Sequence, residues 1–326
     1  MSATLLLIGD IHLGRRPGGL PEDLGDWSLS PYDLTPSAAW RATVELALRR
    51  RVDAVVLAGD VVEADNARFE AFGPLEQGVR RLVESGIGVW AVAGNHDVEA
   101  LPRLAELIPG FHLLGRSGCW ERAAVTHDGE TFLHLLGWSF PARRHPSSPL
   151  DSGGFPPPPD DGLPVIGVMH CDLDGAGSHY APVARAELER APVDGWFLGH
   201  VHKPSEFGGA RPIGYLGSLV GLDPTETGGH GPWLLSVAPG ALSLEQLPLA
   251  PLRWEEVVLD LSGLAGPEEL PEAVIGGLRA LHEGLGPAVG EARAVGCRVR
   301  LTGPTAFHRE LRSKLNGREI ERGGFD

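Results

Sequence analysis

Residues 52–60 read VDAVVLAGD and residues 88–97 read GVWAVAGNHD, two apolar runs that each end in glycine and polar residues. Three more runs of this kind are present: TLLLIGDIH at residues 4–12, LPVIGVMHC at 163–171 and VDGWFLGHVH at 193–202. Each is short and rich in Val, Leu or Ile, which is typical of strands buried in a sheet. Helical patterns separate the first three runs along the chain. This alternation predicts an α/β fold that begins with parallel strand pairing.

Two segments between these runs have the periodicity of helices. The first begins at Thr35-Pro36 and extends toward Arg51, with its apolar residues on one face. The second stops at Gly86, and its apolar residues at helical spacing are Phe69, Phe72, Leu75, Val79 and Leu82. Both segments fit the helical layers of an α/β architecture.

Two changes in composition suggest how the chain is organised. Residues 141–164, PARRHPSSPLDSGGFPPPPDDGLP, are dense in Pro, Gly and Ser, which predicts a surface loop inserted within one domain. Near residue 251 the pattern changes again, and a helix-like segment at 267–285 leads into the alternating CRVRLTG. We therefore predict a large domain over residues 1–250 and a small α+β domain over residues 251–326.

The charge balance narrows the classes of function. The 326 residues include 28 Lys and Arg against 43 Asp and Glu, which gives a formal net charge of −15 at pH 7. This excludes a protein whose whole surface is a polycation for nucleic acid.

The three scattered cysteines form no C-x-x-C pair, which argues against a disulfide framework and a zinc ribbon. The first apolar run stops at Asp10, too early for a signal peptide or a membrane span, so we expect a cytoplasmic protein without a membrane partner.

Residues of metal-binding types stand where the predicted strands end. Asp10 and His12 are two positions apart, so their side chains leave an extended segment on the same face, and His200 and His202 repeat this spacing. The other strand ends carry Asp60, Asn95, His96 and His170. In open α/β sheets, ligands bind outside the carboxyl ends of the strands. A mixed set of oxygen and nitrogen ligands favours Mn, Fe or Zn over Ca or Mg.

Each of these residues by itself has a simpler interpretation, because Asp after Gly and Asn are common turn residues and a single His is usually a packed or surface side chain. Five such blocks in this order are not expected by coincidence. The blocks GDIH, GD, GNHD, a strand-terminal His and GHVH resemble the calcineurin-like metallophosphoesterase superfamily over residues 5–202. The resemblance implies a four-layer α/β/β/α sandwich, with two mixed sheets face to face and helices outside, followed by a small C-terminal α+β capping domain.

The resemblance also implies a catalytic site with two divalent metal ions. Mn is the preferred metal, and Fe and Zn are the alternatives. The first ion would be held by Asp10, His12, Asp60 and His202. The second would be held by Asp60, Asn95, His170 and His200, so that Asp60 is the bridging carboxylate. His96 would protonate the leaving oxygen. Asp97 would hold the His96 ring, and capping of the turn is an equally good interpretation of Asp97.

The choice of phosphoester depends on the rest of the chain. Protein phosphatases of the superfamily have an Arg soon after the second-block Asp and GNHE in the third block, whereas this chain has GDVVEAD and GNHD. Residues 170–235 resemble the bacterial DNA repair exonucleases of the SbcD and YhaO type, and APLRWEEVVLDLSG and RVRLTGPT resemble their capping domain. The resemblance implies a DNA exonuclease, with endonuclease activity as an additional option, and an SbcC-like coiled-coil ATPase as partner. A homodimer is compatible with the sequence. Proteins of this type continue beyond the point where this chain stops.

Several features stay open at this level. Glu63 stands where such nucleases commonly have His or Asp, so its role is open. The candidates for substrate binding are Lys203, Tyr180, Arg298 and Arg300. Residues 298–322 contain seven basic and three acidic residues, which fits either a basic face over the cleft or a solvated helix. The rival functions are a phosphodiesterase for cyclic nucleotides or other small phosphodiesters, and a non-catalytic metal-stabilised scaffold for an ATPase.

Overall fold

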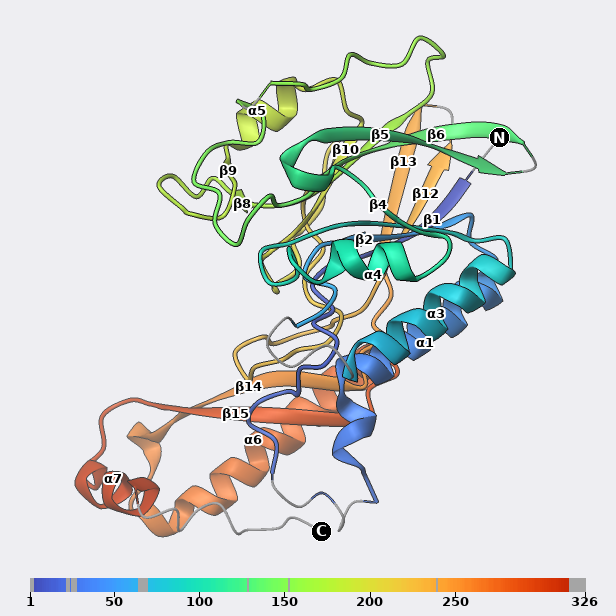
Figure 1. Cartoon of the computed structure of the whole chain (residues 1–326). Coiled ribbons are helices and arrows are strands. Elements are labelled where there is room, and N and C mark those ends of the chain that lie inside the picture. Colours follow the sequence, from blue (N-terminus) through green and yellow to red (C-terminus); the bar gives the residue numbers. More distant parts are fainter. Residues whose placement is uncertain are drawn as a thin grey trace.

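The computed structural model describes residues 3–21, 24, 28–63, 70–127, 129–151, 153–238 and 240–316. Phe69 of the second predicted helix and the tail after residue 316 lie outside these ranges. Within them the chain forms two large sheets, one of six strands and one of five, and two small two-stranded sheets. Figure 1 shows a larger unit built around the two large sheets and a smaller C-terminal unit that carries β14, β15 and α6.

The first large sheet has the strand order β13-β12-β1-β2-β3-β4. Its strands are β1 (Ala3–Ile8), β2 (Ala54–Ala58), β3 (Gly88–Val92), β4 (Phe111–Leu113), β12 (Trp233–Ala238) and β13 (Ala241–Gln246). β1, β2, β3 and β4 pair in parallel, whereas β12 and β13 are antiparallel. The predicted parallel start is therefore confirmed, and the carboxyl ends of β1, β2 and β3 lie at one edge of the sheet.

The second large sheet has the order β11-β10-β7-β6-β5. Its strands are β5 (Trp120–His127), β6 (Glu130–Trp138), β7 (Val165–His170), β10 (Gly195–Gly199) and β11 (Ile213–Tyr215). All neighbours are parallel except β5 and β6, which form an antiparallel hairpin. A short parallel pair, β8 (Asp172–Leu173) and β9 (Pro182–Val183), follows β7.

Alternation of side chains along the strands separates three apolar layers. Leu5 and Leu7 of β1 belong to the core between the two large sheets. Leu6 and Ile8 point to the opposite face of the same sheet and pack in the core that includes residues of α1, α3 and α4. A third core around Trp196 covers the outer face of the second sheet, together with residues of α5. Strands buried on both faces explain the continuous apolar runs, and the layers confirm the α/β/β/α sandwich.

The three predicted helices begin and end close to the predicted positions, and three further helices are present among the described residues. Their bounds are α1 (Pro36–Arg50), α3 (Phe72–Glu84), α4 (Leu101–Leu107), α5 (Arg185–Arg190), α6 (Leu270–Leu285) and α7 (His308–Asn316). Short 3-10 turns lie at Pro31–Leu34, Arg116–Gly118, Leu261–Gly263, Pro267–Glu269 and Gly286–Val289. α1 starts at a proline, whose missing N–H costs nothing in a first turn, and Arg51 ends it in the left-handed conformation. None of the described helices combines the length and hydropathy required to cross a membrane.

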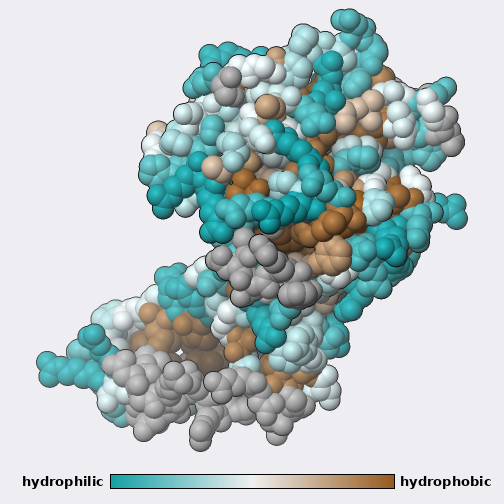
Figure 2. Space-filling model, in the orientation of Figure 1, coloured by the Kyte–Doolittle hydropathy of each residue, from teal (hydrophilic) through white to brown (hydrophobic). Residues whose placement is uncertain are grey.

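The C-terminal unit is small and rests on one parallel pair of strands. β14 (Leu252–Asp260) pairs with β15 (Ala294–Thr302), and α6 packs on β14. The buried residues Leu261, Leu270 and Leu311 form its own core. The start of β14 packs against the large unit instead, because Leu252 and Trp254 are buried in the core of that unit. In Figure 2 the two units form an upper and a lower lobe with a notch between them.

Candidate metal centre

The two large sheets bring the predicted metal ligands together at the carboxyl ends of their strands. Asp10 and Asp60 follow β1 and β2, and His170 and His200 end or follow β7 and β10 of the other sheet. The backbone N–H of His200 donates to both carboxylate oxygens of Asp10 at 3.1 Å, which joins the two sheets at this point. The site is therefore built by strand ends that are up to 190 residues apart in the sequence.

Two glycines in the motifs allow the ligands to pack this closely. A Cβ on Gly94 would lie 2.1 Å from Oδ1 of Asp60, and a Cβ on Gly59 would lie 2.5 Å from Nδ1 of His170. Both distances are far below van der Waals contact, so any side chain at these positions would displace a ligand. Gly59 also has φ of +90°, which glycine adopts at little cost.

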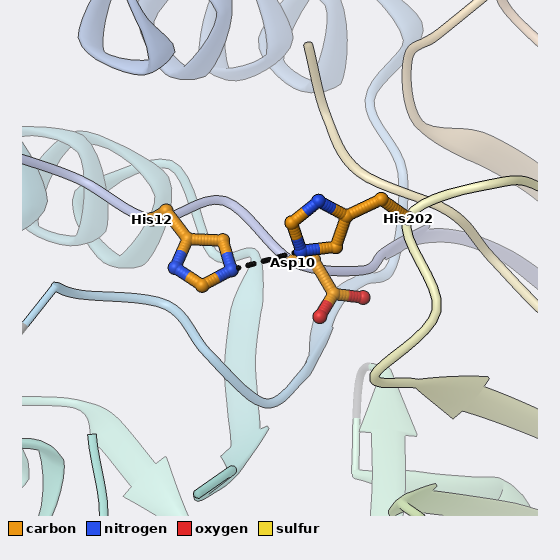
Figure 3. Close-up of side chains that lie close together, drawn as sticks. All are labelled: Asp10, His12 and His202. Carbon is orange, nitrogen blue, oxygen red and sulfur yellow. Dashed lines mark hydrogen bonds between the residues drawn. The ribbon is translucent and has the colours of Figure 1, made fainter. Parts of the chain in front are cut away.

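The first cluster is formed by Asp10, His12 and His202, whose ligand atoms lie within 4.8 Å of one another. Nδ1 of His12 lies 3.0 Å from a carboxylate oxygen of Glu63, and Nδ1 of His202 lies 2.7 Å from one of Glu226. Each carboxylate accepts a hydrogen bond from the Nδ1–H of its histidine, so Nε2 of each ring, when the ring is neutral, carries a lone pair. These two Nε2 atoms face each other at 3.2 Å, with Asp10 beside them (Figure 3). A shared cation satisfies this donor set, which otherwise places acceptor against acceptor.

The second cluster is formed by Asp60, Asn95 and His170. Nδ1 of His170 donates to the carbonyl of Ala58 at 3.1 Å, so Nε2 is the ring atom that would bind a metal ion in place of a proton. That Nε2 lies 3.3 Å from Oδ2 of Asp60 and 3.0 Å from Oδ1 of Asn95. Oδ2 of Asp60 is also 3.8 Å from Nε2 of His12. Asp60 therefore stands between both clusters, where a carboxylate that bridges two ions belongs.

The backbone of the site is strained at the ligands themselves. Among the residues that the structure describes, nine non-glycine residues have positive φ, and four of them are predicted ligands. Their φ angles are 25° at Asp10, 52° at His12, 48° at Asp60 and 107° at His200. Such conformations cost of order 1–3 kcal/mol each and persist where the surrounding structure fixes them. The rest of the fold therefore holds these backbones in strained conformations, and the strain orients the ligand side chains.

Comparison with known proteins identifies this arrangement. Residues 3–204 match the family model described as calcineurin-like phosphoesterase. The chain belongs to this family. Residues 254–321 match a second model, described as the middle domain of metallophosphoesterase YhaO. The two matches confirm that the chain is a member of the metallophosphoesterase superfamily of the YhaO and SbcD type.

Individual relatives extend these matches. The uncharacterized metallophosphoesterase YhaO of Bacillus subtilis is 29% identical over 269 residues, which are 79% of this chain and 63% of that protein. The DNA double-strand break repair protein Mre11 of Haloferax volcanii is 26% identical over 276 residues, 82% of this chain and 56% of that protein. This chain thus spans less than two thirds of these relatives. A solved dimetal phosphatase from Danio rerio covers 75% of the chain, and 95% of its own length, at 14% identity and a TM-score of 0.47.

Burial and charge explain why the phosphoesterase needs cations at this place. Asp10, Asp60 and His170 are at most 2% exposed. Burial raises the pKa of Asp10 above its usual range. For Asp60, burial acts in the same direction, but the neighbouring His170 and His12 outweigh it and lower the pKa. The carboxylates raise the pKa of His170 to about 9 against the effect of burial, whereas burial and His170 lower that of His200 to about 4. Buried carboxylates and histidines packed this closely need opposite charge or metal ions beside them, and the two divalent ions of the family fit this requirement.

The structure corrects one expected contact in the phosphoesterase. The carboxylate that holds the His96 ring belongs to Glu63, whose Oε1 lies 3.0 Å from Nδ1 of His96. Asp97 accepts instead from the backbone N–H groups of Val61 at 2.6 Å and Gly94 at 2.7 Å. Of the two interpretations of Asp97, the structure therefore shows capping of the turn. Burial and the nearby Asp60 raise the pKa of Asp97 to about 7.

The same contact answers the open question of Glu63. One oxygen of its carboxylate binds His12 and the other binds His96, which explains why its pKa lies below the usual range. The hydrogen bond to Glu63 raises the pKa of His96. His96 is the more exposed of the two histidines, so its ring faces the side from which a substrate can approach. The motif positions predicted His96 and singled out Glu63, whereas the two partners of Glu63 follow only from the fold.

The other predicted substrate contacts lie at different distances from the centre. The ring of Tyr180 is 5.2 Å from that of His200, and Lys203 is exposed directly after the last ligand block. Arg298 and Arg300 are exposed on β15 of the C-terminal unit, and Nε of Arg300 lies 3.0 Å from Glu256. Tyr180 and Lys203 are therefore adjacent to the metal ligands, whereas the two arginines belong to the second lobe.

Proposed function

We propose that this phosphoesterase hydrolyses phosphodiester bonds of DNA, as an exonuclease with an additional endonuclease activity, and that its native ions are Mn. The observation that carries the two-metal chemistry is the place of Asp60, whose Oδ2 lies 3.8 Å from Nε2 of His12 in the first cluster and 3.3 Å from Nε2 of His170 in the second. The mixed nitrogen and oxygen ligands support Mn, with Fe or Zn as alternatives.

The residues of the chain have separate tasks in this reaction. Two divalent ions bound here supply Lewis-acid stabilisation of the phosphoryl oxygens and activation of water. His96 donates a proton to the leaving oxygen, because its ring is half-exposed and its pKa is raised by Glu63. Asp60 holds the backbone around His96 in place, since its Oδ1 accepts from the His96 N–H at 2.9 Å. The ring that moves the proton is thus fixed at both its side chain and its backbone.

DNA as the substrate is supported by the relatives and by the local charge. The similarity to Mre11, a DNA double-strand break repair protein by its name, covers 82% of the chain and so includes segments beyond the metal ligands. Lys203 beside the centre, and Arg298 and Arg300 on the C-terminal unit, offer cations for the phosphate backbone. With a formal net charge of −15, the rest of the surface repels DNA. DNA binding should therefore be confined to the metal centre and the C-terminal unit, and should weaken steeply with salt.

A side-by-side assay with manganese tests this function. The substrates are a labelled duplex with free ends, a closed circular duplex and a small chromogenic phosphodiester. We expect cleavage of both DNA substrates by the wild-type protein, and loss of turnover without loss of metal in His96→Ala. The matched control is His112→Ala, an exposed histidine on β4. A hundredfold preference for the small diester with no DNA cleavage would favour the rival phosphodiesterase, and normal DNA cleavage by His96→Ala would refute the assigned proton donor.

We also propose an SbcC-like coiled-coil ATPase as the partner and DNA repair in the cytoplasm as the setting. The support is the match of residues 254–321 to a middle domain, which indicates that this type of protein is built around more than its phosphoesterase unit. Co-expression followed by affinity purification tests the partner, and sedimentation of the isolated protein decides between a monomer and a homodimer. Nuclease activity that does not change when the ATPase is present would contradict the proposed partnership.

A further inference from the structure

Glu226 holds a metal ligand although it lies outside all the metal-binding motifs. One oxygen of its carboxylate accepts from Nδ1 of His202 at 2.7 Å. The other oxygen accepts from the backbone N–H of Leu222 at 2.8 Å and from the hydroxyl of Ser218 at 3.2 Å. Both oxygens are thus engaged, and the His202 ring has one orientation. A carboxylate behind a ligand histidine fixes its tautomer and raises its basicity toward the metal.

Glu226 belongs to the loop of residues 218–230, which touches the first metal cluster along its backbone as well. The N–H of Ser218 donates to the carbonyl of His202 at 2.8 Å, and the N–H of Leu219 donates to that of Asp10 at 3.2 Å. The buried ring of His230 closes the loop, since its nitrogens lie 3.0 Å from the carbonyl of Ser218 and 3.1 Å from that of Glu226. The loop is therefore a closed, internally bonded segment that lies against the metal cluster.

The other side of this loop is bonded to the C-terminal unit through Trp254. Trp254 of β14 is 4% exposed, and its indole N–H donates to the carbonyl of Gly221 at 3.2 Å. Its own carbonyl accepts from the N–H of Gly228 at 2.8 Å. A Cβ on Gly221 would lie 2.8 Å from the Trp254 ring, and one on Gly296 of β15 would lie 2.1 Å from it. The indole is thus packed between the loop and β15 of the C-terminal unit. In Figure 1 the gold loop segments lie beside this unit.

We propose that loop 218–230 couples the C-terminal unit to the first metal position, with Glu226 as the positioning residue for His202 and Trp254 as the contact that keeps the loop in place. The inference rests on the two-metal chemistry of the proposed function but not on DNA as the substrate. Any ligand or partner that shifts β14 then changes the affinity of the first metal position. The second position, around His170, has no bond to this loop among the described contacts and keeps its affinity.

Calorimetric titration of the metal-free protein with Mn²⁺ tests the positioning role. The wild-type protein should bind two ions. Glu226→Ala should weaken one of them by about 10- to 100-fold and leave the other within about twofold, as for other carboxylates behind ligand histidines. Glu226→Gln keeps an acceptor for the His202 ring and should recover part of the lost affinity. The matched control is Glu256→Ala, which removes a carboxylate of β14 that contacts Arg300. Two unchanged affinities in Glu226→Ala would overturn the assignment.

The coupling to the C-terminal unit needs a second pair of variants. Trp254→Phe keeps a ring but removes the indole N–H, and it should weaken the same single ion by about two- to tenfold. In the metal-free protein it should also speed hydrogen exchange at Gly228. Trp120→Phe is the control, because its indole N–H likewise donates to a carbonyl, that of Pro149 at 3.1 Å, and Trp120 lies on β5 of the second large sheet. Equal weakening of both ions, or no difference between the two Phe variants, would refute the coupling. Cleavage of DNA against the small diester is measured separately, so a wrong substrate leaves this result intact.

Discussion

Replacing Glu63 by Gln separates the two histidines that share this carboxylate. Glu63 accepts from Nδ1 of His12 and from Nδ1 of His96, each at 3.0 Å. Glutamine has one acceptor oxygen, so only one of these bonds survives. The side chain of His12 is 1% exposed and that of His96 is 44% exposed. A buried donor left without a partner costs more than an exposed one, so the glutamine oxygen should stay with His12 and His96 should lose its bond.

The size of the effect follows from the bond that is lost. A hydrogen bond to a charged group contributes about 1.5–3 kcal/mol, and about 1.4 kcal/mol corresponds to a factor of ten in rate. Because the His96 ring is 44% exposed, solvent screening favours the lower end of this range. We therefore expect kcat for DNA cleavage to fall about 10- to 30-fold in Glu63→Gln. Both metal ions should remain bound, since His12 keeps its partner.

The assay compares two leaving groups. Glu63→Gln is measured on a DNA duplex and on bis(p-nitrophenyl) phosphate, whose leaving phenolate is stable without a proton. Loss of a positioned acid should lower kcat on DNA but change kcat on the phenyl ester by less than about threefold. Glu76→Gln is the control, because this glutamate pairs with Arg80 on the exposed side of α3. An equal decrease on both substrates, or the loss of one ion in calorimetry, would refute the reasoning and assign Glu63 to the metal ligand His12.

Three further variants or probes test the rest of the site. Asp60→Ala removes the carboxylate between both clusters. Metal analysis should then find that at least one ion is lost, and activity assays should find no turnover. Two retained ions would contradict the bridging role. Gly94→Ala places a Cβ 2.1 Å from Asp60, which should abolish activity and destabilise the fold by about 1–3 kcal/mol in denaturant titrations. Iodoacetamide should modify the exposed Cys119 at least about tenfold faster than the buried Cys171, whose pKa burial raises, as read by peptide mass spectrometry.

The ligands at strand ends were predictable because two local rules combine at each of them. The end of an apolar run marks the end of a strand, and parallel strands present their carboxyl ends at one edge. Asp10, Asp60 and His170 therefore meet in the structure although they are distant in the sequence. The family resemblance added the assignment of the ligands to two positions, and the contacts of Asp60 with both clusters agree with it.

The carboxylates behind the ligands could not be predicted in the same way. Asp97 follows His96 directly, but successive side chains of this turn point in opposite directions, so Asp97 is fully buried while His96 is exposed. Glu63 is 33 residues from His96 and 51 from His12, and Glu226 is 24 residues from His202, in a loop without periodicity. Their contacts depend on where irregular segments run over the sheet ends, which no spacing rule describes.

The first metal position is where these unpredicted carboxylates meet. Glu63 connects it to His96, the proposed proton donor, and Glu226 connects it to the loop that Trp254 fastens to the C-terminal unit. Each ligand histidine of this position is thus held from a different part of the molecule. A displacement of either glutamate would change how strongly the ion is held, because ligand orientation and basicity depend on the hydrogen bond behind the ring. Movement of the C-terminal unit should therefore change metal affinity through Glu226, whereas the bond of Glu63 to His96 can be lost while both ions stay bound.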